Sequence, residues 1–98
     1  GTLSFLIPTV DNPHVRTYMQ TFLAPILLNE ESMNTAISFV RAGGHLEQAA
    51  RTLCLHKNTL RYRVNKLHSQ LAPDLSDEDF YEALSTAIKI YLICQYRT

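Results

Sequence analysis

The sequence predicts an all-α domain, a small bundle of about five helices. Apolar residues recur at intervals of three and four along most of the chain, which is the spacing of helices that bury one face. From His45 to Leu71 a short helical stretch, a turn of about three residues and a longer helical stretch follow one another, which is the signature of a helix-turn-helix. The 98 residues are 46% apolar and 18% charged, enough for one core and too few charges for a disordered chain.

We expect residues 1–12 to be an N-terminal arm or linker and residues 13–98 to form the helix-turn-helix domain. The apolar run Leu3–Ile7 ends at Pro8. It could form a strand, pack on the helices as an extended arm, or join an upstream domain, and the sequence leaves these alternatives open.

Two helices are expected before the helix-turn-helix. Asn12 followed by Pro13 is a helix-start signal, and the helix should end near Leu23 because Pro25 disfavours helical angles at the residue before it. The second helix should run from about Glu31 to Ala42, and the glycine pair 43–44 should stop it. In a helix-turn-helix domain this would be the support helix that closes the core of the motif. The apolar faces of the two helices contain Val15, Tyr18, Met19, Phe22, Met33, Ala36, Ile37 and Val40.

The helix-turn-helix itself should comprise a first helix from Leu46 to Leu53, a turn at residues 54–56, and a recognition helix of about residues 57–71. Ala49 and Ala50 are small enough for a second helix to cross closely, and Leu55 would fill the angle. At ~100° per residue, one face of the longer helix is apolar and the opposite face is polar. The apolar face contains Leu60, Val64, Leu67 and Leu71, and the polar face contains Asn58, Arg61, Tyr62 and Asn65.

The polar face has the side chains that bind nucleic acid. Arginine pairs with guanine, asparagine with adenine, and tyrosine or threonine with phosphates. Free backbone N–H groups at the start of the helix also favour a phosphate, and His56 could contact phosphate or cap the helix. The predicted DNA-binding residues are His56, Lys57, Asn58, Thr59, Arg61, Tyr62 and Asn65. The alternative is an ordinary solvated face.

The last helix should start at residues 76–79, with acids in its first turn, and continue to about Gln95. Its stripe of apolar residues faces a core, whereas Ile90 and Ile93 add apolar surface beside the stripe. Burial in the core and burial against a second subunit both remain open for these two isoleucines. The stripe comprises Phe80, Leu84, Ala87, Ile88, Tyr91 and Leu92.

Charge is segregated along a chain of zero net charge. His45 to Gln70 has a net charge of +4, and Leu71 to Thr98 has a net charge of −3, with histidine neutral. A local basic patch of this kind is what DNA binding needs. Arg63 could contact phosphate or pair with the acidic start of the last helix, and Arg51 is expected in solvent. His45 and His68 are expected to be plain surface residues.

The sequence contains no motif that indicates an enzyme. The four histidines lie at unrelated spacings, and no metalloprotease motif, glycine-rich phosphate loop or nucleophile elbow occurs. We expect no catalytic residues, no metal and no cofactor. Cys54 and Cys94 form no zinc spacing and are interpreted as free thiols in a reducing cytosol. No apolar run is long enough to span a membrane, so a cytoplasmic protein is expected.

The run from Ala49 to Arg63 resembles the C-terminal helix-turn-helix of the PucR-type regulators, which include the CdaR-type sugar-diacid regulators. The resemblance extends more weakly from Phe22 to Tyr96. In that family a polar capping residue such as Asn usually stands where His45 is, and a glycine often lies near Ala72 and Pro73. The matching residues are Ala49, Ala50, Leu53, His56, Asn58, Thr59, Leu60, Tyr62 and Arg63.

This resemblance implies the DNA-binding output domain of a bacterial transcriptional regulator, with the recognition helix in the major groove. The expected partners are double-stranded DNA, a second copy of the chain on adjacent half-sites, and a sensory region upstream of residue 1, with no membrane partner. The alternative is a helical protein–protein interaction or dimerisation module that does not bind nucleic acid.

Overall fold

A computed structural model describes residues 12–97, and every element in that range is an α-helix. The predicted all-α class is therefore confirmed. Residues 1–11, where the arm or linker was expected, lie outside the described residues. The helices are α2 (Pro13–Leu23), α3 (Glu30–Arg41), α4 (Leu46–Thr52), α5 (Lys57–Leu71) and α6 (Asp77–Arg97).

The predicted boundaries of α2 and α5 are confirmed at both ends. The helix α3 begins and ends one residue before its predicted limits, α4 ends one residue early, and α6 extends two residues beyond the predicted end at Gln95. These differences lie within the usual uncertainty of helix ends.

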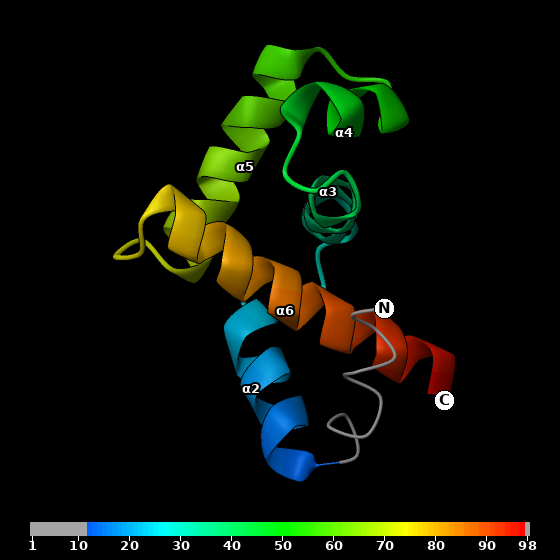
Figure 1. Ribbon diagram of the computed structural model, residues 1–98, viewed down its shortest axis with the longest axis vertical. Helices are drawn as coiled ribbons and strands as arrows, with labels where there is room; N and C mark the ends of the chain where they lie inside the picture. Colours follow the sequence, from blue (N-terminus) through cyan, green and yellow to red (C-terminus); the bar gives the residue numbers. More distant parts are fainter. Residues whose placement is uncertain (1–11, 98) are drawn as a thin grey trace.

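The helices form two layers on either side of α6. Figure 1 shows α6 crossing the middle of the molecule, with α2 on one side and α3, α4 and α5 on the other. The helix α6 packs against both α2 and α3, and α3 in turn packs against α4 and α5. The support role expected for α3 is confirmed, since it lies between the helix-turn-helix and α6.

One apolar core joins these helices. The helix α5 contributes Leu60, Val64 and Leu67, which are all buried. Ile90 and Ile93 of α6 are also buried in this core. The surplus apolar surface of α6 is therefore used within the chain, because α6 has neighbours on two sides.

Local signals explain where the helices start and stop. The Asn12 and Asn29 side chains accept hydrogen bonds from the first turns of α2 and α3, and the Ser76 hydroxyl accepts one from the Asp79 N–H at the start of α6. Gly43 and Gly44 adopt positive φ angles of 65° and 87°, as the predicted left-handed stop requires. A Cβ on Gly44 would also lie 3.3 Å from the ring of Tyr81.

The turn between α4 and α5 is tight because small residues and backbone hydrogen bonds hold it. Ala49 and Ala50 are buried, and the N–H of Leu55 donates to the carbonyl of Ala50 at 2.9 Å. Cys54 has a φ of 57°, the only positive φ among the non-glycine residues described. Leu55 is partly buried against the core, as predicted for the residue that fills the angle.

The central packing residue of α5 gives a direct test of this fold. Leu60 has no exposed surface, so Leu60→Ala should lower the free energy of unfolding by about 2–5 kcal/mol through lost burial and a residual cavity. Urea unfolding followed by circular dichroism measures this loss. Leu28→Ala is the matched control, because Leu28 is fully exposed and its truncation should change stability by less than about 0.5 kcal/mol. Equal effects of the two substitutions would contradict the assignment of the buried face.

Candidate nucleic-acid interface

The polar face of α5 lies in solvent, opposite its buried leucines. Asn58, Arg61, Tyr62 and Asn65 are all exposed, and Tyr62 has 68% of its surface accessible. The structure thus brings together the four side chains that the sequence predicted on this face.

The start of α5 is capped by its own histidine. Nδ1 of His56 accepts a hydrogen bond from the backbone N–H of Asn58 at 3.0 Å, and His56 is the N-cap residue of the helix. Of the two roles that the sequence left open for His56, the structure shows the capping role. Thr59 follows in the first turn and is exposed.

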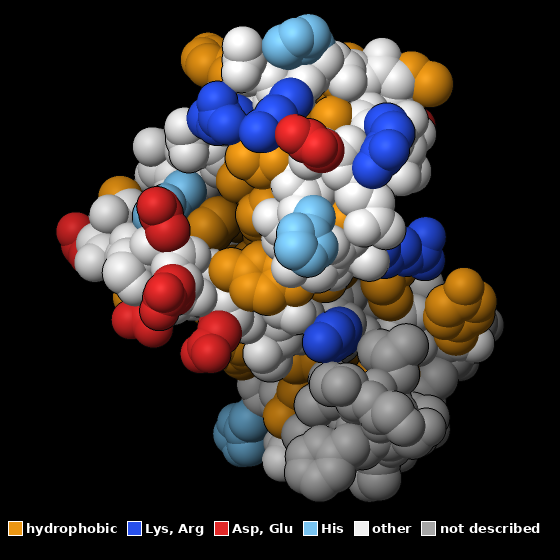
Figure 2. Space-filling model, turned by 45° about the horizontal axis from the view of Figure 1, so that its top comes forward, with side chains coloured by type: hydrophobic (Ala, Val, Ile, Leu, Met, Phe, Trp, Pro, Cys, Tyr) orange, Lys and Arg blue, Asp and Glu red, His pale blue; other side chains and the backbone are white. Residues whose placement is uncertain are grey.

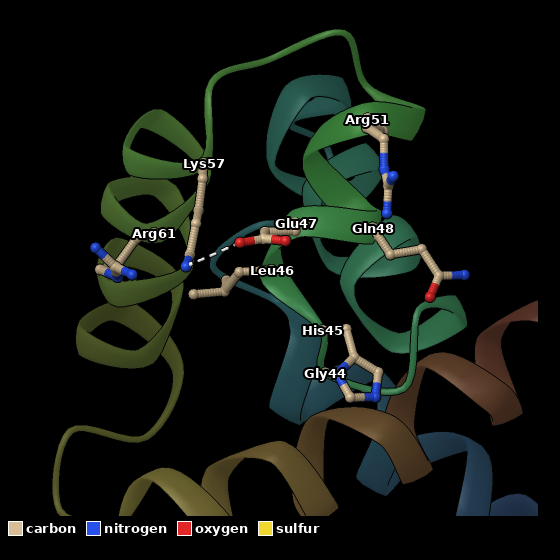
Figure 3. Close-up of a pocket in the computed structure, with 8 residues that line it drawn as sticks. All are labelled: Gly44, His45, Leu46, Glu47, Gln48, Arg51, Lys57 and Arg61. Carbon is tan, nitrogen blue, oxygen red and sulfur yellow. Dashed lines mark hydrogen bonds and ion pairs between the residues drawn. The ribbon is translucent and has the colours of Figure 1, made fainter.

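The next residue, Lys57, pairs with an acid from the preceding helix. Its Nζ lies 3.3 Å from a carboxylate oxygen of Glu47 on α4, and both side chains are well exposed. Figure 3 shows this pair bridging the two helices. A pair exposed in this way is weak, so Lys57 can exchange Glu47 for another anion at small cost.

Two of the predicted base-reading residues bond to each other. An Nη1 hydrogen of Arg61 is donated to the side-chain oxygen of Asn58 at 3.1 Å, one helical turn apart. The amide oxygen of Asn58 is therefore turned toward Arg61. Sequence reasoning placed both residues on one face but treated them as independent.

A hollow separates α4 from the start of α5. Its volume is about 500 Å³, and it is open to solvent. Figure 3 shows that its wall comprises the first turn of α4 on one side and Lys57 and Arg61 of α5 on the other. Figure 2 shows Lys and Arg side chains gathered around one acidic side chain in the upper part of the molecule, with a separate acidic group at the left. The lining residues are Gly44, His45, Leu46, Glu47, Gln48, Arg51, Lys57 and Arg61.

Arg51 and His45 are exposed, as the sequence predicted. His45 is the N-cap residue of α4 but makes no side-chain capping hydrogen bond. The departure from the resembling family at this position therefore leaves α4 without the side-chain cap that an asparagine could supply.

Arg63 corrects one sequence expectation. Its guanidinium lies 3.8 Å from a carboxylate oxygen of Glu31 in the first turn of α3, and not beside the acidic start of α6. The reason is that α5 packs against α3, which brings Glu31 to the flank of α5. The packing of two helices so far apart in sequence could not be read from the residue pattern.

His68 corrects a second expectation, because it is not a plain surface residue. Its ring stacks on Phe80 with centroids 4.4 Å apart and planes 7° apart. Nε2 lies 2.7 Å from the carbonyl oxygen of Leu75 and donates to it, and Nδ1 lies 3.3 Å from a carboxylate oxygen of Asp77. The chain after α5 folds back over His68, so this residue joins the end of α5 to the start of α6.

Lys66 was counted in the basic stretch but not among the predicted site residues. It is exposed on α5 and makes no ion pair with an acid among residues 12–97. Its angular position places it at the edge of the polar face, beside Tyr62. The helical spacing alone could have identified it.

Residues 12–97 contain no group of three or more His, Cys, Asp or Glu side chains arranged to hold a metal ion. No helix in the same range is long and apolar enough to cross a membrane.

The comparison with known protein families agrees with this geometry. Residues 33–90 match the model of the PucR C-terminal helix-turn-helix domain. The chain belongs to this family. The matched range begins inside α3 and ends inside α6, so it includes the whole of the PucR-type helix-turn-helix, and α2 lies outside it.

A similar protein from Thermomonospora curvata, described as an uncharacterized protein in the pkwA 5' region, is 28% identical over 74 residues. The aligned region covers 71% of this chain and 41% of that relative, so the chain spans less than half the length of the relative that it matches. No solved structure matches the chain.

The histidine cap of this PucR-type recognition helix can be tested by substitution. His56→Ala should destabilise the domain by about 0.5–2 kcal/mol, because the Asn58 N–H loses its acceptor. His56→Asn should restore most of that stability, since asparagine is among the best N-cap residues. Thermal or urea unfolding of the three proteins measures both effects. If His56→Asn is as unstable as His56→Ala, the hydrogen bond is not what His56 contributes.

Proposed function

We propose that this PucR-type domain binds double-stranded DNA sequence-specifically, as the output domain of a bacterial transcriptional regulator. The recognition helix α5 enters the major groove with its exposed face toward the bases. The domain comprises residues 13–98, and residues 1–12 serve as an arm or linker. DNA binding also implies that the protein works in the cytoplasm of a bacterium.

The rotation of α5 is the observation that carries this proposal. Leu60, Val64 and Leu67 are buried, so the opposite face of the helix must point to solvent. That face is rich in groups that hydrogen-bond to base edges and phosphates, and no helix of residues 12–97 covers it. A helix that packed this face against the same chain could not enter a groove.

The surroundings of α5 supply phosphate contacts. Lys57 and Arg61 line the hollow beside α4, and Arg51 adds a further cation from α4 itself. The first turn of α5 also points backbone N–H groups and the positive end of the helix dipole outward. Thr59 and Tyr62 can donate hydroxyl hydrogens to the same backbone. To contact a phosphate, Lys57 would exchange its ion pair with Glu47 for one with the phosphate.

A single helix-turn-helix makes few contacts, so we infer that two copies bind adjacent half-sites one helical turn apart. The relative from Thermomonospora curvata extends well beyond the matched region, which agrees with a sensory region elsewhere in a longer chain. Such a region would control binding by setting the distance or orientation between two output domains.

Retention on a random DNA duplex at low salt tests the proposal. The protein should be retained, and a variant with Lys57→Glu and Arg61→Glu should pass through. A matched variant with Arg41→Glu and Lys89→Glu has the same net charge but leaves the α5 surface unchanged, so it should still be retained. If the protein itself is not retained, or if both variants are lost equally, DNA binding through α5 is wrong.

The salt dependence of binding tests Lys57 individually. Lys57→Ala should make the slope of log K against log salt shallower by roughly one unit, because one phosphate contact is removed. Fluorescence anisotropy with a labelled duplex at several salt concentrations measures the slope. Lys89→Ala on α6 is the matched control and should leave the slope unchanged. An unchanged slope for Lys57→Ala would remove this lysine from the interface.

A further inference from the structure

The hydrogen bond between Asn58 and Arg61 restricts which bases these two residues can read. Both side chains are exposed, and the amide oxygen of Asn58 accepts from Nη1 of Arg61 at 3.1 Å. Only the oxygen of the amide can accept a hydrogen, so the chemistry fixes the orientation of the Asn58 amide. Its NH₂ group is then the part of Asn58 that points away from Arg61.

The pair presents donors to a ligand. Arginine has five N–H donors and no acceptor, and one donor is used by Asn58. Four donors of Arg61 and the two of the Asn58 amide remain. No acid of the described residues forms an ion pair with Arg61. Glu47, which lines the same hollow, pairs with Lys57. The remaining donors of Arg61 are therefore available at the open hollow between α4 and α5.

This donor pattern distinguishes guanine from adenine. In the major groove guanine offers two acceptors, N7 and O6, whereas adenine offers the N7 acceptor beside an N6 donor. An asparagine that reads adenine must turn its oxygen toward that N6 donor, but the oxygen of Asn58 is turned toward Arg61. The adenine contact expected for Asn58 from the sequence would have to share this oxygen between Arg61 and the N6 donor of adenine.

We propose that Asn58 and Arg61 act as one donor unit that reads the N7 and O6 acceptors of guanine in the major groove. This inference rests on the proposed function and adds the base that the interface selects. Arg61 provides the bidentate contact, and Asn58 holds the guanidinium in place while its own NH₂ group donates to a neighbouring acceptor. Preorganisation of this kind reduces the conformational entropy lost on binding.

The first experiment identifies the base and the groove. Duplexes that bind the full chain are selected from a random pool, and each guanine in the selected site is replaced in turn. 7-Deazaguanine removes the N7 acceptor from the major groove, and inosine removes only the minor-groove amine. At one guanine, 7-deazaguanine should weaken binding by about 5- to 150-fold, the range for loss of a bidentate contact, whereas inosine should be tolerated.

The second experiment assigns that guanine to the pair. The readout is the ratio of affinities for the guanine and 7-deazaguanine duplexes, in which overall charge effects cancel. Arg61→Ala should reduce this ratio to near one. Asn58→Ala should lower it in the presence of Arg61 and leave it unchanged in the Arg61→Ala background, because Asn58 acts through Arg61.

Two variants serve as controls for the second experiment. Asn58→Asp keeps the acceptor for Arg61 and should retain the preference for guanine, even though its negative charge weakens binding to every duplex. Asn34→Ala removes an exposed amide from α3, outside the interface, and should leave the ratio unchanged. Circular dichroism of each variant verifies that it is folded.

The outcomes separate the two proposals. Failure of the unsubstituted protein to bind any duplex would refute the proposed function itself. Binding in which no guanine is sensitive to 7-deazaguanine would refute only the donor unit. A guanine preference that Asn58→Ala lowers equally with and without Arg61 would show that the two residues act separately, and the unit would again be wrong.

Discussion

Burial of one face of α5 is the constraint on which the rest of the structure depends. Leu60 and Leu67 have almost no exposed surface, and Val64 lies between them, so the rotation of the helix about its axis is fixed. Turning α5 by one residue would expose leucines and bury amides, at a cost of several kcal/mol in unsatisfied polar groups and lost apolar burial. The same packing that stabilises the fold therefore also determines which side chains face solvent.

Contacts between polar side chains join α5 to α4, α3 and the start of α6. Lys57 meets Glu47 on α4, Arg63 meets Glu31 on α3, and His68 lies beside Asp77 at the start of α6. The first two pairs are solvent-exposed and contribute little stability. They matter more for the distribution of charge, because Glu47 and Glu31 partly neutralise Lys57 and Arg63. Among the described residues, Arg61 and Lys66 are the lysine and arginine side chains of α5 that have no acidic partner. A chain of zero net charge thus presents a local basic surface.

The sequence alone was enough to predict the helices, but it was not enough to predict which side chains of different helices contact each other. The caps at Asn12 and Ser76, the glycine stop and the apolar spacing each involve neighbouring residues, so the helix bounds were predicted to within two residues. The Arg63–Glu31 pair and the stacking of His68 on Phe80 depend on how helices pack, which short-range patterns do not encode. The same reason explains Ile90 and Ile93, whose burial on two sides was foreseen without deciding between the core and a partner.

The central claim is that the exposed face of α5 is the surface that meets DNA. Nuclear magnetic resonance of the ¹⁵N-labelled protein, titrated with a duplex selected from a random pool, tests it residue by residue. The account predicts that the largest chemical-shift changes occur at residues 56–66 and at the first turn of α4, with α2 and the second half of α6 nearly unchanged. Changes centred on α2 and α6, with the amides of Asn58, Arg61 and Asn65 unaffected, would contradict it.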